Sequence, residues 1–266
     1  MPYLSKIAIN PRRPGAMRLL GNPHAMHAAV LAGLAQQPVT ERVLWRAETT
    51  NAHRPEILVL TDSRPDFTHI IEQAGWPDAD GGQPLVRDYA PLLDRIAVGR
   101  EFAFRLTANP VQHLRHPQKM SDEQAALRAK QDTMDGTCAE RKVRGFRVAH
   151  RTAAQQLAWL LSRAERAGFQ IPPTRTTSFS AAAELGLGEP GEPAPDVALT
   201  ARDVLRFRKH KGGREVVVAT ATFQGRLRVT DTNALRNALL NGIGPSKAYG
   251  QGLLTLAPLA QEPQHA

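Results

Sequence analysis

The chain has 266 residues, 42% of them hydrophobic, and a formal net charge of +9. This length suits one large or two small domains, and we expect two. No apolar run approaches the roughly 18 residues of a membrane span, and the first residues lack the apolar stretch of an export signal, so we expect a cytoplasmic protein without membrane contacts. The single cysteine, Cys138, excludes an internal disulfide and a multi-cysteine zinc site.

The positive charge is concentrated toward both ends of the chain. Residues 1–54 hold seven Lys and Arg against two Asp and Glu, and residues 204–256 hold nine against two. Residues 55–99 reverse the balance, with three basic against eight acidic residues. This segregation indicates a basic surface built from both ends and a polyanionic partner such as a nucleic acid, although ordinary solvated charge is the alternative.

The first half of the chain predicts a sheet with two helices. Strands are expected at 3–9, 43–49, 56–62 and Phe102–Leu106, because these runs are rich in β-branched or alternating apolar residues. Residues 10–21 read as a connecting loop, since Asn10-Pro11 and Pro14-Gly15 are turn pairs. Helices are expected from Asn22-Pro23, which suit a cap and a first turn, and over residues 65–74.

The second half repeats this pattern after a polar stretch. Residues 111–150 read as a linker with mobile parts, and residues 153–167 as an amphipathic helix. A strand near 175–180 and a Gly/Pro-rich loop at 186–196 precede two long β runs, 197–209 and 215–230, which predict a basic hairpin. A helix at Thr232–Leu240, capped by Asp231 or Thr232, and a strand at Leu253–Leu256 complete the pattern.

The two halves predict an α+β fold of two tandem ferredoxin-like, RRM-type domains. The order strand, helix, strand, strand, helix, strand is typical of that unit. We expect an N-terminal domain at 1–110, a linker or insert at 111–150 and a C-terminal domain at 151–258.

A glycine-rich segment lies between the last expected helix and strand, at residues 242–252. Glycines let backbone amides approach a phosphate, while a nearby hydroxyl and ammonium add a donor and a charge. The spacing is neither a Walker A loop nor a Rossmann fingerprint, so we expect no nucleotide cofactor. The residues expected to contact phosphate are Gly242, Gly244, Ser246, Lys247, Tyr249 and Gly250. A plain structural turn is the alternative.

Several motifs together resemble one protein family. They are YLSKIAINPR at the start, Asn22-Pro23-x-x-Met26-His27, Leu44-Trp45-Arg46, Phe104-Arg105-Leu106-x-Ala108-Asn109-Pro110, and the terminal GIGPSKAYGQGLLTL. In order and spacing they resemble the CasE-type CRISPR repeat-processing endoribonucleases of type I-E systems. The resemblance implies two RRM-like domains, metal-independent cleavage on the 3′ side of a repeat stem-loop, and assembly into the Cascade complex.

The resemblance places catalysis on His27, because the family's histidine at this helix position transfers protons. Imidazole suits this role at neutral pH, and RNA supplies its own nucleophile, the 2′-OH. The products implied are a 2′,3′-cyclic phosphate and a 5′-OH. Where relatives often carry tyrosine this chain has His24, which either shares the proton transfer or is a bystander. Two histidines at i and i+3 without a further ligand are too few for a metal, so we expect none.

The basic hairpin and the basic residues around the first expected loop are candidate RNA contacts. In the family a hairpin at this position enters the major groove of the RNA stem. The candidate residues are Arg206, Arg208, Lys209 and Lys211 on the hairpin, and Arg12, Arg13 and Arg18 near the helix of His27. A solvated basic edge strand is the alternative for the hairpin.

Three functions remain in competition. The first is the endoribonuclease, and the second is a non-catalytic subunit that binds an RNA hairpin. The third is a general RNA chaperone, for which residues 242–252 and His27 would share no site.

Overall fold

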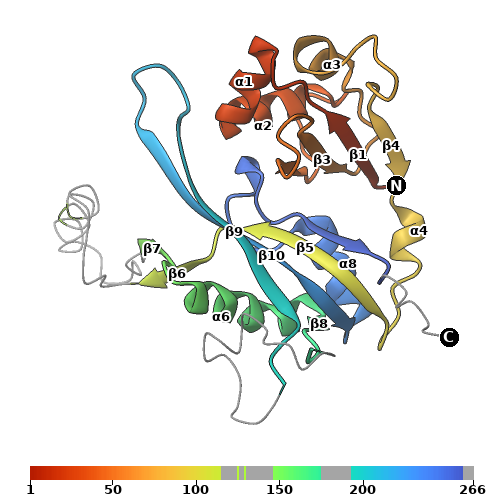
Figure 1. Cartoon of the computed structure of the whole chain (residues 1–266), viewed down its shortest axis with the longest axis vertical. Coiled ribbons are helices and arrows are strands. Elements are labelled where there is room, and N and C mark those ends of the chain that lie inside the picture. The colour runs from red at the N-terminus through yellow and green to blue at the C-terminus, as the bar shows by residue number, and fades with distance from the viewer. Residues whose placement is uncertain (115–124, 126–128, 130–145, 175–192, 260–266) are drawn as a thin grey trace.

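A computed structural model describes residues 1–114, 125, 129, 146–174 and 193–259. The strands of the first half form an antiparallel sheet in the order β2-β3-β1-β4 (Figure 1). Their bounds are β1 Tyr3–Ala8, β2 Leu44–Glu48, β3 Glu56–Thr61 and β4 Leu85–Asp88. The three strands expected at 3–9, 43–49 and 56–62 are therefore confirmed.

Three helices cover one face of this first sheet. They are α1 Pro14–Gly21, α2 Pro23–Ala32 and α3 Thr68–Ala74. Their apolar side chains form a core with Ile7, Trp45 and Val59. The expected connecting loop at 10–21 was wrong, because Pro14 opens a helix that buries Ala16 and Leu19.

The expected membership of Phe102–Leu106 in the first sheet was also wrong. This run lies within β5, Glu101–Ala108, which pairs with β10 and β11 of the second sheet. The strand that pairs with this edge of β1 is β4. Strand β4 is short and mostly exposed, and it shows no alternation of apolar residues that would predict a strand. A short helix, α4 Ala90–Leu93, connects β4 to β5.

The second sheet has the order β11-β5-β10-β8, with β9 also paired to β10. The other bounds are β8 Phe169–Gln170, β9 Val197–Arg208, β10 Glu215–Val229 and β11 Leu254–Ala257. Helices α6 Ala153–Ala164 and α8 Thr232–Asn241 pack on one face, and Asp231 caps α8 as expected. The turn η2, Glu165–Ala167, completes the expected helix at 153–167. Beyond the sheet, β9 and β10 continue as the predicted hairpin (Figure 1).

Residues 111–150 are not all linker. Their ends pair as a two-stranded sheet, with β6 Val111–Leu114 against β7 Phe146–Ala149. The strand expected at 175–180 lies outside the described residues, as does most of the loop expected at 186–196. Among the residues that are described, no helix has the length and apolarity to span a bilayer.

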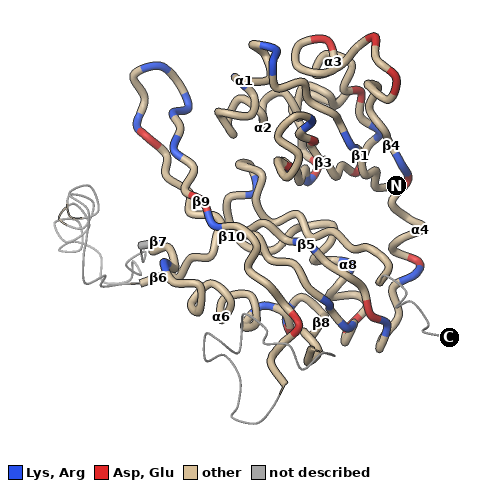
Figure 2. The backbone as a smooth tube through the Cα atoms, viewed as in Figure 1, with Lys and Arg blue, Asp and Glu red and all other residues tan. Residues whose placement is uncertain are grey.

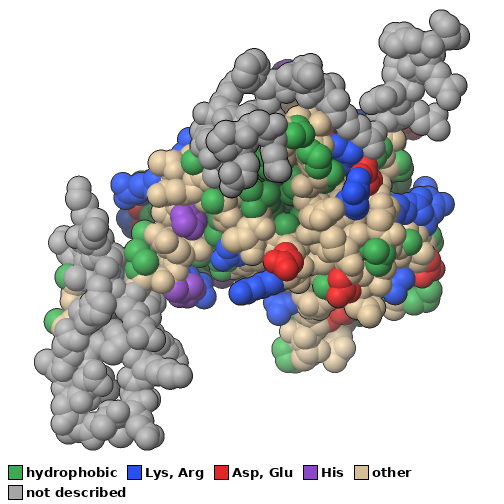
Figure 3. Space-filling view, turned by 90° about the horizontal axis from the view of Figure 1, so that it is seen from below, with side chains coloured by type: hydrophobic (Ala, Val, Ile, Leu, Met, Phe, Trp, Pro, Cys, Tyr) green, Lys and Arg blue, Asp and Glu red, His purple; other side chains and the backbone are tan. Residues whose placement is uncertain are grey.

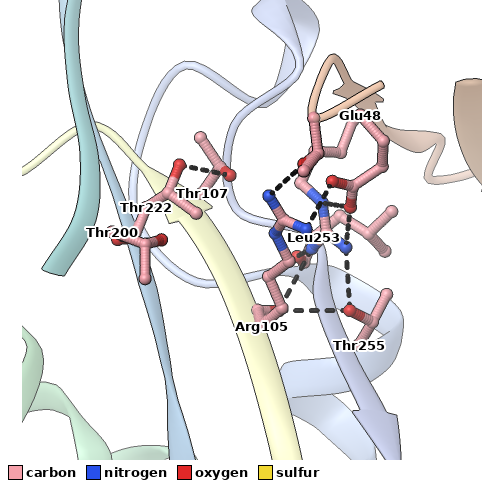
Figure 4. A network of polar contacts seen from close by, with 9 residues as sticks. Glu48, Arg105, Thr107, Thr200, Thr222, Leu253 and Thr255 are labelled. Atoms are coloured by element: carbon pink, nitrogen blue, oxygen red, sulfur yellow. Dashed lines mark hydrogen bonds and ion pairs between the residues drawn. The ribbon is translucent and has the colours of Figure 1, made fainter. Parts of the chain in front are cut away.

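Arg46 joins the two sheets. Its side chain is 2% exposed and donates to the carbonyls of Arg105 and Leu253, at 3.1 and 2.7 Å, and to the Thr255 hydroxyl at 2.8 Å. Glu48 accepts from the Arg46 guanidinium and also pairs with Arg105 (Figure 4). A strand of the first sheet is thereby bonded to two strands of the second, so the sheets are held in one orientation.

Candidate active site

Helix α2 carries both candidate histidines, and its start is set by the residues that the sequence indicated. Asn22 caps the helix, its Oδ1 accepting from the amides of His24 and Ala25 at 3.0 and 3.4 Å. Pro23 occupies the first turn, where it needs no amide donor. The side chain of Asn22 therefore occupies two of the free amides at this end of the helix.

His27 and His24 are both half-buried, one turn apart on α2. Burial lowers the pKa of His27, and the neighbouring His24 lowers it further. Its Nδ1 is buried and has no hydrogen-bond partner among the described residues. The imidazole is therefore biased to its neutral form, which can accept a proton.

The glycine-rich segment lies beside α2, although some 220 residues of chain separate them (Figure 1). The contact is made by η3, Lys247–Tyr249, which also touches β2. A single site formed by His27 and residues 242–252 requires that α2 and this segment be neighbours, and they are. Burial and the nearby Arg42 lower the pKa of Lys247, a half-buried ammonium in this loop.

Only part of this loop is free to act as a phosphate cradle. The amides of Gly242, Ile243, Tyr249, Gly250 and Gly252 donate to backbone carbonyls. Those of Gly244, Ser246, Lys247, Ala248 and Gln251 have no backbone hydrogen bond to a described residue. A cradle therefore has most of its available donors at 244–248, and the expected amides of Gly242 and Gly250 are engaged in holding the loop.

Two of the glycines are required by packing against tryptophan rings. Gly250 has φ +77°, and a Cβ there would lie 2.7 Å from the Trp45 ring. Gly244 has φ +84°, and a Cβ there would lie 2.9 Å from Trp159. The loop is thus pressed against both halves of the molecule, which fixes its position relative to α2.

Ser246 is held in an unusual backbone conformation by a residue that the sequence analysis did not single out. Its φ is +65°, in the left-handed region that non-glycine residues rarely occupy. Asn109 Nδ2 donates to its hydroxyl at 2.8 Å. Asn109 belongs to the segment 104–110, and its place in the sequence does not predict a partner 137 residues away. Backbone strain of this kind persists only where the surroundings impose it, often at functional sites.

The hairpin concentrates positive charge next to this loop. Figure 2 shows basic residues around its tip, where Arg206, Arg208, Lys209 and Lys211 are all exposed. Arg206 pairs with Glu215 across the strands at 3.2 Å. On the face turned to the viewer in Figure 3, by contrast, basic and acidic side chains are interspersed. The hairpin is therefore the stronger candidate for a polyanion contact.

Two of the three arginines expected to contact RNA near α2 have protein partners. Arg13 donates to the carbonyls of Ile71 and Gly75 at the end of α3, at 3.4 and 3.3 Å. Arg18 donates to Gln73 at 3.3 Å. Arg13 therefore satisfies the end of a helix, a structural role that its place in a basic cluster did not reveal. Arg12 is exposed, and its contact with RNA remains a prediction.

A cavity of about 420 Å³ lies between the sheets and was not anticipated from the sequence. It is bounded by the loop at Tyr249–Gln251, by Met26 on the α2 face away from solvent, and by threonines of the second sheet. Three of these threonines, Thr107, Thr200 and Thr222, lie close together in Figure 4. Neither candidate histidine lines the cavity, so it is separate from their ring atoms.

The chain is similar to known CRISPR-associated proteins along most of its length. The family described as CRISPR associated protein matches residues 2–258. The CRISPR-associated endoribonuclease Cse3 of Thermus thermophilus is 30% identical over 263 residues, covering 96% of this chain and all of that protein. The CRISPR system Cascade subunit CasE of Escherichia coli is 25% identical over 198 residues, covering 73% of this chain and 77% of that one.

A solved structure of Thermus thermophilus Cse3, bound to an RNA representing a pre-cleavage complex, is also similar. It is 29% identical, with a TM-score of 0.65 over 97% of this chain and 99% of that chain. The chain belongs to the CRISPR-associated protein family and is of the CasE/Cse3 type. The resemblance drawn from the sequence motifs is therefore confirmed.

Proposed function

We propose that the chain is a metal-independent endoribonuclease that cleaves precursor CRISPR RNA at the base of the repeat stem-loop. The observation that carries this proposal is the contact between α2, which holds His24 and His27, and η3 of the glycine-rich loop. The similarity of the chain to the endoribonuclease Cse3, along nearly its whole length, supports RNA cleavage as the class of reaction.

In the proposed reaction, the 2′-OH oxygen attacks the adjacent phosphorus and the bond to the 5′ oxygen breaks. The products are a 2′,3′-cyclic phosphate and a 5′-OH. Since the pKa of His27 is lowered, its neutral imidazole suits removal of the 2′-OH proton. His24, on the same side of α2, suits return of a proton to the 5′ oxygen. Lys247 and the free amides at 244–247 suit the charge that develops on the phosphate.

No metal is needed for this chemistry, because the nucleophile belongs to the substrate and alignment supplies much of the rate. Among the described residues, no group of three or more His, Cys, Asp or Glu has the arrangement of a metal site. Metal independence is part of the proposal, and cleavage in the presence of a chelator tests it.

We further propose that the protein keeps its product and acts as a subunit of the type I-E surveillance complex in the cytoplasm. The similarity to a Cascade subunit, CasE, supports this role. A non-catalytic subunit that binds the RNA hairpin is the alternative, and only a cleavage assay separates the two. The contact between α2 and the loop speaks against the RNA chaperone, for which these segments would share no site.

The two halves are proposed to be tandem ferredoxin-like domains. In support, the orders β4-β1-β3-β2 and β11-β5-β10-β8 follow the same pattern of fourth, first, third and second strand when β9, which also pairs with β10, is left out of the count. The sheet memberships favour a boundary near α4, Ala90–Leu93, over the expected boundary at residue 110.

The decisive experiment is cleavage of the cognate repeat hairpin in excess EDTA by wild type, His27→Ala and His24→Ala. We expect the wild type to cut and leave a 2′,3′-cyclic phosphate, and His27→Ala to bind RNA without cutting it. A substrate with a 2′-deoxy nucleotide before the scissile phosphate should bind and stay intact. His53→Ala, which removes an exposed loop histidine, is the matched control and should cut normally. A requirement for divalent metal, or full cutting by His27→Ala, would refute the mechanism.

A further inference from the structure

Asn22 uses both ends of its side-chain amide, and the two ends face different elements. Its Oδ1 accepts from the first amides of α2, as described above. Its Nδ2 donates to the carbonyl of Arg208 at 3.1 Å, which joins residues 186 positions apart in the chain. Arg208 is the last residue of β9, where the strand enters the tip of the hairpin. One side chain therefore bonds the histidine helix to the hairpin.

A second contact ties the same part of the hairpin to the glycine-rich loop. The rings of Phe207 and Tyr249 meet edge to face, with centroids 4.8 Å apart. Phe207 is only 6% exposed, whereas its neighbours Arg206 and Arg208 point to solvent. The strand thus turns an aromatic side chain toward the loop and its guanidinium groups away from it.

We propose that Asn22 is a positioning residue for RNA cleavage. It fixes the position of the hairpin, which holds the RNA, relative to α2, the helix that carries His27. The inference deepens the proposed function and rests on it. The physical reason is that the hairpin extends beyond the sheet as a two-stranded ribbon, and that the contacts of Asn22 and Tyr249 beside its tip set the position of its far end relative to α2. Near-attack alignment tolerates little displacement, and an error of about 1 Å costs up to roughly 100-fold in rate.

The helix cap alone does not require asparagine. Serine and aspartate cap helices as well as asparagine does, because each offers an oxygen acceptor to the first amides. Neither has an amide donor for the Arg208 carbonyl. The substitution Asn22→Ser therefore keeps one half of the interaction and removes the other.

The test measures single-turnover cleavage of the repeat hairpin with the full chain, at saturating protein and across pH. Affinity is measured separately with the 2′-deoxy RNA. For Asn22→Ser we expect a rate lowered about 10- to 100-fold, an affinity and Tm close to wild type, and an unmoved inflection in the pH profile. The matched control is Asp231→Ser, which changes a cap of the same two-amide geometry on α8 and should cleave normally.

Asn22→Asp is the second variant, since it also caps without donating but differs in charge. A rate within twofold of wild type in either Asn22 variant overturns the proposal. The proposal is also overturned if the loss of cleavage rate is proportional to the loss of Tm across the two Asn22 variants and Asp231→Ser. The loss of rate would then come from reduced stability of the protein. Failure of the proposed function looks different, because wild type itself would then not cut in EDTA.

Discussion

At the scale of single residues, the site depends on how the protein environment changes an ordinary imidazole. His27 loses solvent on α2, and His24 adds a second group that disfavours a positive charge. Both effects act in the same direction, so the neutral form persists at a pH where an exposed histidine would begin to gain a proton. The neutral form of His27 that the proposed mechanism needs is therefore favoured before any RNA is present.

We expect the imidazole of His27 in the RNA-free protein to titrate below pH 6.5, the ordinary value for histidine. An NMR titration of the histidine ring signals, assigned with His27→Ala, measures this directly. Replacing His24 with asparagine should shift the His27 titration upward, because one of the two causes is removed. The same shift predicts that His27 lowers the free energy of unfolding as the pH falls, since the unfolded chain binds the proton more readily. A titration at or above 6.5 would contradict the structure.

Sequence patterns identified the histidines and the loop, but not the residues that hold them. His27 and the segment 242–252 stand out through residue type and motif. The roles of Asn109, and of the Asn22 amide toward Arg208, depend on which strands become neighbours. That information is spread over the whole chain, so no local spacing contains it.

At the scale of elements, the hairpin is a ribbon whose charged residues are mostly basic and gather toward its tip. Asn22 and Tyr249 hold it at Arg208 and Phe207, beside the tip, and the basic side chains of the tip are exposed. Under the proposed function, these contacts keep the exposed basic side chains in a fixed position relative to α2 when they meet RNA.

We expect Lys209→Gln and Lys211→Gln each to weaken RNA binding and to reduce the salt dependence of affinity. The slope of log K against log[salt] should fall by about one for each phosphate that no longer meets an ammonium group, because fewer counterions are released. Binding titrations over a salt series measure the slope. The control is Arg87→Gln on β4, which removes an equal charge far from the hairpin (Figure 1). If all three variants change the slope equally, the effect is one of net charge.

Elements with a strong pattern were predictable, and those without one were not. The long alternating runs of β9 and β10 and the capped helix α8 are signalled locally. Helix α1 was not predicted, because it begins with a Pro-Gly pair that is equally typical of turns. Strand β4 was not predicted, because its mostly exposed residues show no apolar alternation. Strand β5 was recognised, but its partners were not, since a period of two residues says nothing about which strands pair.

At the scale of the whole molecule, two sheets are held together by a buried charge. Arg46 satisfies two carbonyls and a hydroxyl of the second sheet while it is paired with Glu48. Such an arrangement specifies orientation, because few other positions of the sheets satisfy all these groups together.

We expect Arg46→Met to lower the free energy of unfolding by about 3–5 kcal/mol, since it leaves buried acceptors without donors. Urea unfolding followed by fluorescence measures the loss. Arg87→Met is the matched control, and at its exposed position the change should stay within about 0.5 kcal/mol. An equal effect of both substitutions would mean that the Arg46 network contributes little to stability.

The contact between α2 and η3 also has a consequence for biosynthesis. A nascent chain translated to the end of α8 already has both histidines and the basic hairpin, but it lacks the loop that completes the site. Under the proposed function, such a chain could not yet cut RNA. Competence would come only once η3 and β11 have left the exit tunnel and docked.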